Sequence, residues 1–446
     1  MKHKLKILLP AIGLLVLMKG NAQEKKTISL TDAVEMSLKN SHQLKNSSAK
    51  IEEATAALRE ATEKRLPGAS VSGSYLRFNN ANFDLKSKDN SGSGGGTPAE
   101  TPKVNQAVYG LVNVSLPIYT GGRIKYGIES SRYLEQATKL DADNNRDEVI
   151  QNTIEAFANL FKAKTAVGLV KENLLQSQQR EKDFSNLEKN GLLARNDLLK
   201  AELQSSNVEL SLVDAENNWQ LANINMNLML GLPDATELVL DTAGIEKKDD
   251  TRTLDDFIQA ANNNRKDLSA LALRKKAAQS DLRVSKSDFY PSFQLTGGYV
   301  AADIPNFFTV TNAFDIGFGL SYNIASLWKT KAKVQQSNAR IKQIVENQAM
   351  LNDDIRLQVN KSYLTLLSNR KKIEVYVKAV TQAEENYRIV KNKFDNNLAT
   401  TTDLLDADVA QLQARLSYTL ARADAFVAYN KLLQSAGISI TDFKNK

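Results

Sequence analysis

The chain of 446 residues contains no cysteine, and this absence excludes several kinds of site. A chain without thiols has no disulfide, no thiolate nucleophile, no cysteine-ligated zinc and no N-terminal cysteine for a lipid anchor. Histidine is nearly absent too, because only His3 and His42 occur. His42 stands between Ser41 and Gln43 in a helical pattern and is interpreted as a surface residue. With no nucleophile–base pair and no cofactor motif, we expect no catalytic, cofactor-binding or metal-binding residues and no enzymatic activity.

Long hydrophobic runs are missing except near the N-terminus. Residues 1–22 combine three early lysines, an apolar run from Ile7 to Met18 and small residues up to Ala22, which is the pattern of a secretory signal peptide. A membrane anchor is the alternative, but Pro10 interrupts the run, and about 11 apolar residues are too few to span a bilayer. Because no other stretch is apolar enough for a transmembrane helix, an exported chain that enters a membrane must use β-strands.

A large excess of charge of one sign is also lacking. The formal net charge is +7, and loss of the signal peptide removes four lysines and no acid, which leaves +3. So small a charge on a chain of this length gives no electrostatic reason to bind nucleic acid, and no motif of a nucleic-acid-binding module is present. We therefore expect no nucleic-acid partner.

An internal duplication organises the rest of the chain. Positions in the first half match positions 224 residues later, and beyond the strand regions the offset becomes 206. The first half is longer where it carries the Gly/Ser run 91–96, so an insertion at a loop tip explains the change of offset. No Lys-Ser or Lys-Thr follows this run, which argues against a phosphate loop. The matched pairs include Leu30 and Leu254, Pro67 and Pro291, Tyr75 and Tyr299, Asp197 and Asp403, and Gly231 and Gly437.

The duplication sets the predicted domain boundaries. The signal peptide covers residues 1–22, the first repeat 23–233, a linker 234–253, the second repeat 254–437 and a C-terminal tail 438–446. Each repeat is expected to contain a helix, a pair of strands and a long helical hairpin. The linker contains one β-like run, Leu238–Leu240, and a charge run that is explained as solvated.

Four strands are predicted, at about 69–78, 108–119, 292–300 and 314–324. In the last of them the even positions are apolar, beginning with Phe314, while the odd positions are small or polar, beginning with Asp315. This period of two predicts lipid on one face and water on the other. A soluble sandwich has the same period, but the chain offers no second sheet to cover the apolar face. Four strands are too few to close a membrane barrel, so several copies would have to share one.

Long helices are predicted for most of each repeat. From Gly121-Gly122 the chain runs to Lys189 without a proline, and about 67 helical residues would extend about 100 Å. Asn190-Gly191 predicts the turn. The returning segment has apolar or small residues at every third or fourth position, and the second repeat keeps this register, which is typical of a coiled coil.

Shorter helices are predicted ahead of each strand pair. They run from Leu30 to about Arg65 and from Leu254 to about Asp288. Thr31 and Asp255 stand at matching positions near the two starts and are predicted to be the N-caps.

Three acidic residues follow the predicted hairpin turns. Asp197 comes after the first turn, and Asp403 and Asp406 come after the second. Acids in the first turn of a helix complement the helix macrodipole. Their position alone therefore favours a structural role over a functional one.

Taken together, these features resemble the TolC-like outer-membrane efflux protein family over essentially the whole mature chain. The resemblance rests on the doubled order of helix, strand pair and hairpin, on the Asn190-Gly191-Leu192 turn, on Asp-Leu-Leu-x-Ala at 197–201 and 403–407, and on the run Leu116-Pro117-Ile118-Tyr119-Thr120-Gly121-Gly122-Arg123. It implies a mainly α fold with membrane β. In such a homotrimer, twelve strands, four from each chain, form a shared β-barrel in the outer membrane, and a coiled-coil α-helical barrel continues it through the periplasm.

The resemblance also implies a function and partners. The chain would be the passive exit duct of a tripartite efflux or type I secretion system, working with a periplasmic adaptor (membrane fusion) protein, an inner-membrane RND or ABC pump and outer-membrane lipid. The alternative is a structural or adhesive exported coiled-coil protein, which would explain the helices but not the strands. A wide water-filled duct selects little, so the sequence specifies neither the transported substrate nor the partner pump.

The residue roles that the resemblance implies lie at the hairpin turns. Asp197, Asp403 and Asp406 match a periplasmic gate, and the adaptor-docking tips match Asn190, Gly191, Leu192, Asn397 and Leu398. The chain departs from the family where an aromatic hydroxyl and an arginine often brace the gate, because it has Phe394 and Ala399 there. Arg195 is one candidate for a brace elsewhere.

Overall fold

The computed structural model describes residues 25–82, 103–241, 250–305 and 307–438. The predicted signal peptide, the Gly/Ser run 91–96, most of the linker's charge run and nearly all of the C-terminal tail lie outside the described residues. The chain forms two compact units. The tip unit comprises residues 1–42, 146–261 and 358–446, and the sheet unit comprises residues 43–145 and 262–357. Each unit contains segments of both sequence repeats, so the units do not follow the repeat boundaries.

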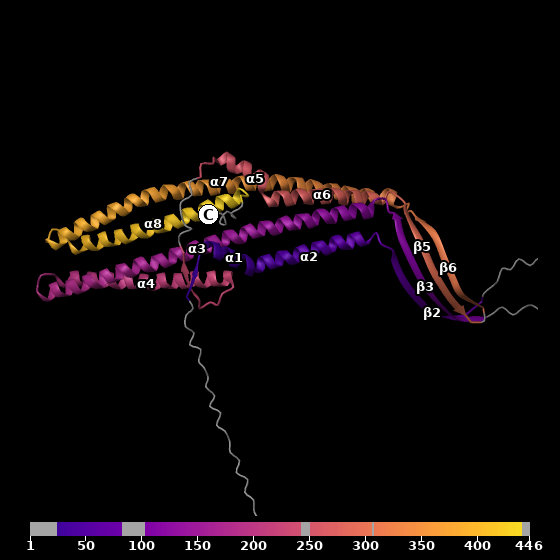
Figure 1. The fold of residues 1–446 in the computed structure, drawn as a ribbon, viewed down its shortest axis with the longest axis horizontal. Coiled ribbons are helices and arrows are strands. Elements are labelled where there is room, and N and C mark those ends of the chain that lie inside the picture. The colour runs from indigo at the N-terminus through magenta and orange to yellow at the C-terminus, as the bar shows by residue number, and fades with distance from the viewer. Residues whose placement is uncertain (1–24, 83–102, 242–249, 306, 439–446) are drawn as a thin grey trace, which may run out of the picture. The chain divides into compact units, whose positions relative to one another are not determined.

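The sheet unit contains one antiparallel sheet with the strand order β2-β3-β5-β6. Figure 1 shows the four strands side by side as a curved ribbon. The pairing of β3 with β5, for example Val112 opposite Tyr299, places the two sequence repeats next to each other. Each strand begins or ends beyond its predicted range, most of all at the start of β6, whereas β6 ends at Ser321, before the predicted end at 324. The strands are β2 (Gly68–Asn82), β3 (Lys103–Tyr119), β5 (Ser292–Ile304) and β6 (Phe308–Ser321).

One face of this sheet is apolar and open in the single chain. The register puts Leu295 opposite Leu116 on one side and Phe318 on the other, so apolar side chains form rows across three strands. Along β6 the alternate side chains are highly exposed, with Phe314 at 80%, Ile316 at 82% and Phe318 at 89%. Contact of such rows with water is unfavourable by about 25 cal/mol for each Å². This face therefore needs a cover that the described residues of the single chain do not supply.

Four helices contribute to the sheet unit. Polar side chains join the helices in pairs: Asn145 Nδ2 donates to Ser47 Oγ at 3.0 Å, the hydroxyls of Ser285 and Ser337 lie 3.0 Å apart, and Arg274 pairs with Asp141. The helices are α2 (His42–Glu63), α6 (Lys266–Ser287) and the first parts of α3 (Arg123–Lys189) and α7 (Ser326–Asp395).

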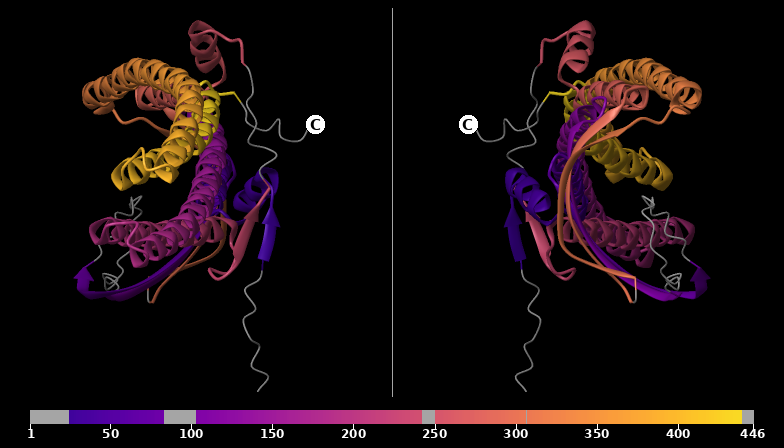
Figure 2. Two further views of the ribbon diagram at one scale, coloured as in Figure 1. Left: turned by 90° about the vertical axis from the view of Figure 1, so that its left-hand side faces the viewer. Right: turned by 90° about the vertical axis from the view of Figure 1, so that its right-hand side faces the viewer.

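The tip unit contains the two long hairpins. The later parts of α3 and α7 turn back into α4 (Arg195–Leu230) and α8 (Thr401–Ser435), and Figure 2 gives two further views of these helices. Two shorter helices, α1 (Leu30–Asn40) and α5 (Leu254–Asn264), belong mostly or wholly to the same unit. Within the described parts of the chain, none of the helices has the length and apolar character needed to cross a bilayer.

A small parallel sheet fastens the start of the described chain to the linker. β1 (Lys25–Ile28) pairs with β4 (Glu237–Leu240), with Lys25 opposite Glu237. β4 lies where the β-like run Leu238–Leu240 predicts a strand, but β1 has no counterpart in the prediction. Its partner is more than 200 positions away, and such a pairing leaves no local pattern in four residues.

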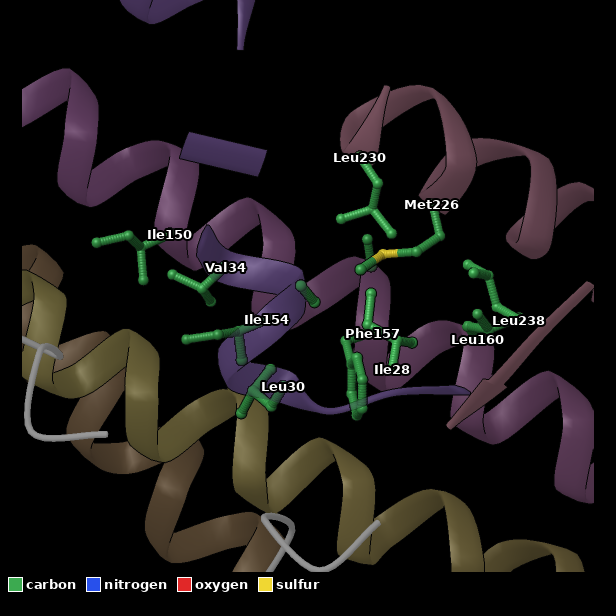
Figure 3. Close-up of a cluster of buried hydrophobic side chains, with 12 residues drawn as sticks. Ile28, Leu30, Val34, Ile150, Ile154, Phe157, Leu160, Met226, Leu230 and Leu238 are labelled. Atoms are coloured by element: carbon green, nitrogen blue, oxygen red, sulfur yellow. The ribbon is translucent and has the colours of Figure 1, made fainter. Parts of the chain in front are cut away.

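The main core of the tip unit lies where α1, α3, α4 and the small sheet meet. Figure 3 shows these buried apolar side chains converging from several elements. Phe157 and Ile154 on α3 and Met226 and Leu230 on α4 are completely buried. The strands add Ile28 and Leu238 to the same cluster. This core fixes α4 against α3 at the end of the hairpin that lies away from the turn.

The N-caps of the short helices differ from the prediction. Ser29, not Thr31, caps α1: its hydroxyl accepts from Asp32 N at 3.2 Å, and the Asp32 carboxylate accepts from Ser29 N at 3.2 Å. Such a reciprocal pair is a capping box. Thr31 lies already inside the first turn.

The second repeat corrects the prediction in the same way. Thr253 and Asp256 form the equivalent reciprocal pair at the start of α5, so Asp255 is not the cap. The hydrogen bond from the Thr253 amide, followed by that from its hydroxyl, lowers the pKa of Asp256. Positions 29 and 253 are again 224 apart, so the duplication includes the caps themselves.

The end of the linker is held by a carboxylate. Asp250 Oδ1 accepts from Arg252 Nε at 2.9 Å, and Asp250 Oδ2 accepts from the Tyr429 hydroxyl at 3.2 Å. The hydrogen bond from Arg252 is the main cause that lowers the pKa of Asp250 to about 2. This contact attaches the linker to α8.

The buried core gives a stability prediction. Phe157→Ala removes a completely buried aromatic side chain, and we expect it to lower the free energy of unfolding by about 3–5 kcal/mol, because the transfer term and the cavity term add. Phe157→Leu leaves a smaller void and serves as the matched control, with an expected loss of about 1 kcal/mol. Denaturant midpoints followed by circular dichroism measure both. Equal losses of unfolding free energy in the two variants would contradict the buried position of Phe157.

Candidate functional site

Both hairpins turn through the same backbone geometry. Gly191 and Asn397, which the 206-residue offset aligns, have φ values of 71° and 60°. The next amide, that of Leu192 or Leu398, then donates to the carbonyl five residues earlier, at 2.8 and 2.7 Å. A residue with a left-handed backbone conformation at the end of a helix produces this hydrogen-bond pattern. Asparagine tolerates the left-handed region better than other residues with a side chain, which explains how Asn397 occupies the position of a glycine.

The turns present apolar side chains to solvent. Leu192 is 71% exposed and Leu398 is 76% exposed, and the neighbouring Asn190 is exposed as well. Burial of one such leucine against a partner is favourable by about 1.5–3 kcal/mol. The adaptor-docking role of these turns stays a prediction, and the paired exposed leucines give it a physical basis.

The three predicted gate acids have different surroundings. Asp403 belongs to a capping box at the start of α8, where its Oδ2 accepts from Thr400 N at 2.8 Å and from Thr400 Oγ1 at 2.6 Å. The hydroxyl bond, followed by the amide bond, lowers the pKa of Asp403. Asp406 lies one turn further along α8 and is exposed. Asp403 therefore has a structural role at the helix start, and its carboxylate stays ionised at neutral pH.

Asp197 lacks the corresponding cap. The N-cap of α4 is Ala194, which has no side-chain acceptor. Asp197 instead accepts from Lys200 Nζ at 3.1 Å, and the same ammonium lies 3.4 Å from Thr402 Oγ1 on α8. The acid of the first hairpin is thus paired with a lysine, whereas Asp403 of the second hairpin is bound by the capping residue Thr400.

A small apolar cluster joins the two hairpins next to the turns. Phe184 of α3, Leu198 of α4 and Leu404 of α8 are buried together. The ring of Phe394 on α7 stacks on Phe184, with centroids 5.2 Å apart and planes 25° apart. Phe394 lacks the hydroxyl of the family pattern, and in this chain its ring makes an apolar contact between hairpins.

Sequence reasoning missed a buried charge pair close to this cluster. Arg180 Nη1 on α3 donates to Asp408 Oδ2 on α8 at 3.0 Å, and Arg180 Nη2 donates to the Tyr387 hydroxyl on α7 at 3.2 Å. Asn173 Nδ2 donates to the same Asp408 oxygen at 3.3 Å. The side chains of Arg180 and Asp408 are only 8% and 1% exposed. We call Arg180, Asp408, Tyr387 and Asn173 the inter-hairpin network, because it links α3 of one hairpin to α7 and α8 of the other.

The pKa of Arg180 depends on its contact with Asp408. Burial alone would lower the pKa of Arg180, but the hydrogen bond and the charge of Asp408 outweigh it and raise that pKa. The second carboxylate oxygen, Asp408 Oδ1, is buried and accepts no hydrogen bond within the described structure. A buried pair with one unsatisfied oxygen contributes little net stability. Removal of either partner nevertheless leaves the other charge buried without a counter-ion.

A groove runs beside the network. It has a volume of about 470 Å³ and is lined by α3 and α7 residues, including Arg180, Phe184, Tyr387 and Phe394. Arg195, the brace that the sequence suggested, is exposed and has no acidic partner within the described residues. The charged contact between the hairpins is therefore made by Arg180 beside the groove and not by Arg195.

Comparison with known proteins decides the family. A sequence profile described as outer membrane efflux protein matches residues 33–232 and 257–438, which is most of the chain. The chain belongs to the outer membrane efflux protein family. The two matched segments correspond to the two repeats, which supports the predicted internal duplication.

Individual relatives agree with this membership. The chain is 24% identical over 264 residues to the outer membrane protein TolC of Vibrio cholerae, a region that covers 55% of this chain and 58% of the relative. It is similar in fold to the outer membrane protein VceC of Vibrio cholerae, with a TM-score of 0.75, 17% identity and coverage of 92% and 96%. The outer membrane channel CmeC of Campylobacter jejuni gives a TM-score of 0.74, 17% identity and coverage of 92% and 85%.

Family membership confirms several expectations from the sequence. The mainly helical fold, the TolC-like resemblance and the outer-membrane location with a periplasmic helical part are those of this efflux protein family. Its members are passive channels, so this efflux protein is not an enzyme. The gate and docking residues are not decided by membership and remain predictions.

A signal for the inter-hairpin network was present in the sequence of this efflux protein. Arg180 follows Ser177 and precedes Phe184 in the three-and-four spacing of the α3 seam, and Asp408 stands four residues after Leu404 in the α8 seam. A charged residue at a seam position requires a partner of opposite charge. The sequence thus marks both residues as charges that need a partner, and the structure shows that they are partners of each other.

The network gives a second stability prediction. Asp408→Asn leaves the buried Arg180 charge without its counter-ion, and we expect it to lower the free energy of unfolding by about 3 kcal/mol. Glu385→Gln removes an exposed partner of Arg388 and serves as the matched control, with an expected loss below about 1 kcal/mol. The double variant Arg180→Met with Asp408→Leu should regain most of the loss. Denaturant unfolding in detergent measures all three, and a loss for Asp408→Asn no larger than the control would refute the role of the pair.

Proposed function

We propose that this efflux protein is the outer-membrane exit duct of a tripartite efflux or type I secretion system. It acts as a homotrimer and conducts substrates passively to the outside. A periplasmic adaptor and an inner-membrane RND or ABC pump deliver the substrates and supply the energy. The proposal extends the family membership to a specific role, partners and assembly.

The two-faced sheet is the observation that carries the proposal. One face has rows of exposed apolar side chains such as Phe318, and the opposite side of the same strands bears small or polar residues such as Ser115, Thr296 and Gly317, which the register aligns. Lipid covers the first face and water fills the space behind the second. The outer strands β2 and β6 each pair on one side only within the described sheet, so strands of further copies complete a closed sheet.

The hairpin turns support the partner assignment. Two exposed leucines at equivalent turns, Leu192 and Leu398, offer repeated apolar contact points. In a threefold assembly such contacts occur six times, and six weak contacts made together give strong overall binding. Asn190, Gly191 and Asn397 hold the turns that present them.

The acids of α8 support a gate. In a trimer, Asp403 and Asp406 bring six carboxylates to one opening, and a ring of carboxylates favours cations over anions. Asp197 adds less, because Lys200 compensates its charge. The inter-hairpin network keeps the two hairpins of each chain together, in place of the bonds that Phe394 and Ala399 cannot form.

The assembly state tests the proposed duct. We expect light scattering with the detergent contribution subtracted to give the mass of three chains for protein purified from outer membranes, and planar bilayers to show a stable conductance for the same sample. A control sample heated to full unfolding should lose both. A monomer that stays soluble without detergent would contradict the proposal and favour a structural coiled-coil protein.

The acidic ring gives a separate prediction. Asp403→Asn with Asp406→Asn should lower the cation preference of the conductance, because the charge is lost while an asparagine oxygen still caps α8. Asp353→Asn with Asp354→Asn, two exposed acids in the middle of α7, is the matched control and should leave the selectivity unchanged. Reversal potentials in a salt gradient measure the effect. Unchanged selectivity in the first variant would exclude the ring.

A further inference from the structure

A polar pocket of about 420 Å³ lies in the sheet unit where the strands end and the long helices begin. Thr120 and Arg123 line it at the start of α3, and Ser326, Lys329 and Lys333 line it from the first turns of α7. Asp288, between α6 and β5, completes the charged lining. Neither the hairpin tips nor the gate acids are part of this pocket, and nothing in the proposed function uses it.

Asp288 arranges two of the cations. Its Oδ1 accepts from Arg123 Nη2 at 2.8 Å, and its Oδ2 accepts from Lys333 Nζ at 2.8 Å. Each carboxylate oxygen thus fixes one cation, so the guanidinium and the ammonium are held on the pocket wall before any ligand arrives. Such preorganisation reduces the entropy lost when a ligand binds.

The pocket has an excess of positive charge. Three cations, Arg123, Lys329 and Lys333, line it together with the single carboxylate of Asp288, which leaves a net charge of +2. Lys329 has no ionic partner in the described part of the chain, although it belongs to the same helical turns. Two long helices, α3 and α7, begin at the pocket and α6 ends there at Asp288, so two positive helix ends and one negative end face it, and the balance adds to the attraction for anions.

A buried hydroxyl in the pocket wall has no partner. Ser326 is 7% exposed, and its Oγ neither donates nor accepts a hydrogen bond in the described structure. An unpaired buried hydroxyl is unfavourable by about 1–3 kcal/mol. The oxygen of a bound ligand would give this hydroxyl the acceptor that it lacks.

The strand register shows which side of the sheet the pocket faces. Ser292 and Ser321 line the pocket and stand directly opposite each other in the sheet. The adjacent pair Phe293 and Leu320 belongs to the apolar face, and neighbouring residues on a strand point to opposite sides. The pocket therefore lies on the polar side, away from the face that lipid would cover.

We propose that this pocket binds a tetrahedral oxyanion of the phosphate or sulfate class. Arg123, Lys329 and Lys333 supply the charge, and the Ser326 hydroxyl donates to one ligand oxygen. The oxyanion is a free ion or the anionic group of a solute in the water-filled space. The binding of an oxyanion is inferred from the pocket alone. The origin of that oxyanion, a solute in the duct, rests on the proposed function.

Calorimetric titration of the purified protein in a neutral detergent at low ionic strength tests the site. We expect inorganic phosphate and sulfate to bind with saturation, and chloride at equal ionic strength to give no saturable heat. Lys329→Gln should weaken phosphate binding about tenfold, because one charge-assisted contact is lost. Lys331→Gln, two residues further along the same helix and outside the pocket lining, should bind like the parent protein.

A second variant separates binding from folding. Ser326→Ala removes the unpaired hydroxyl, so it should weaken phosphate binding while the denaturant midpoint without phosphate stays equal or rises. Absence of saturable phosphate binding by the parent protein, or an equal loss in Lys329→Gln and Lys331→Gln, would overturn the proposal. Because these titrations need no conductance, a failed duct and a failed oxyanion site give different results.

The source of the oxyanion is tested with a soluble short-chain phosphatidylglycerol below its micelle concentration. Saturable binding of inorganic phosphate that the phosphatidylglycerol does not displace supports a solute ligand, as the position of the pocket on the polar side of the sheet requires. Stronger binding of the phosphatidylglycerol than of phosphate would mean that a lipid headgroup occupies the pocket, and would overturn the solute assignment.

Discussion

The alternation of apolar and polar side chains along four strands is the constraint on which the rest of this structure depends. Contact of rows such as Leu116, Leu295 and Phe318 with water is unfavourable, and the described residues of one chain supply neither a covering layer nor enough strands to close the sheet. The proposal that lipid and further copies complete the sheet rests on that one fact. The helical hairpins bury their seams within the chain, but they too expose apolar side chains, such as Leu203 and Leu210 on α4.

The two hairpins of one chain are joined by contacts of two physical kinds. Next to the turns, Phe184 and Phe394 stack within an apolar cluster, which tolerates small sliding movements at little cost. Further from the turns, Arg180 and Asp408 form a buried charge pair, which has one good geometry and a high cost for any partial separation. The pair also breaks the internal symmetry, because the duplication aligns Arg180 with Asn386 and Asp408 with Glu202.

Some features were predictable because they are written in local patterns. The period of two indicated the second strand of each pair, and the three-and-four spacing indicated the hairpins. The capping residues were placed wrongly at Thr31 and Asp255, since several hydroxyl and acidic residues compete within one turn and only the backbone decides which one lies outside the helix. β1 was missed because its pairing with β4 joins distant segments and four residues carry too weak a pattern. Arg180 and Asp408 were missed because each seam was considered alone.

The sequence by itself determined the class of protein: an exported, duplicated chain with two-faced strands and long coiled-coil helices, since periodicity and repetition are properties of the order of residues. It also determined the identical turns at Gly191 and Asn397, which local backbone preferences produce. Only the tertiary structure decided which charges meet. The pairing of Arg180 with Asp408, and of Arg123 and Lys333 with a single Asp288, brings together residues 45 to 228 positions apart. Electrostatic contacts depend on distance in space, and no pattern along the chain encodes that distance.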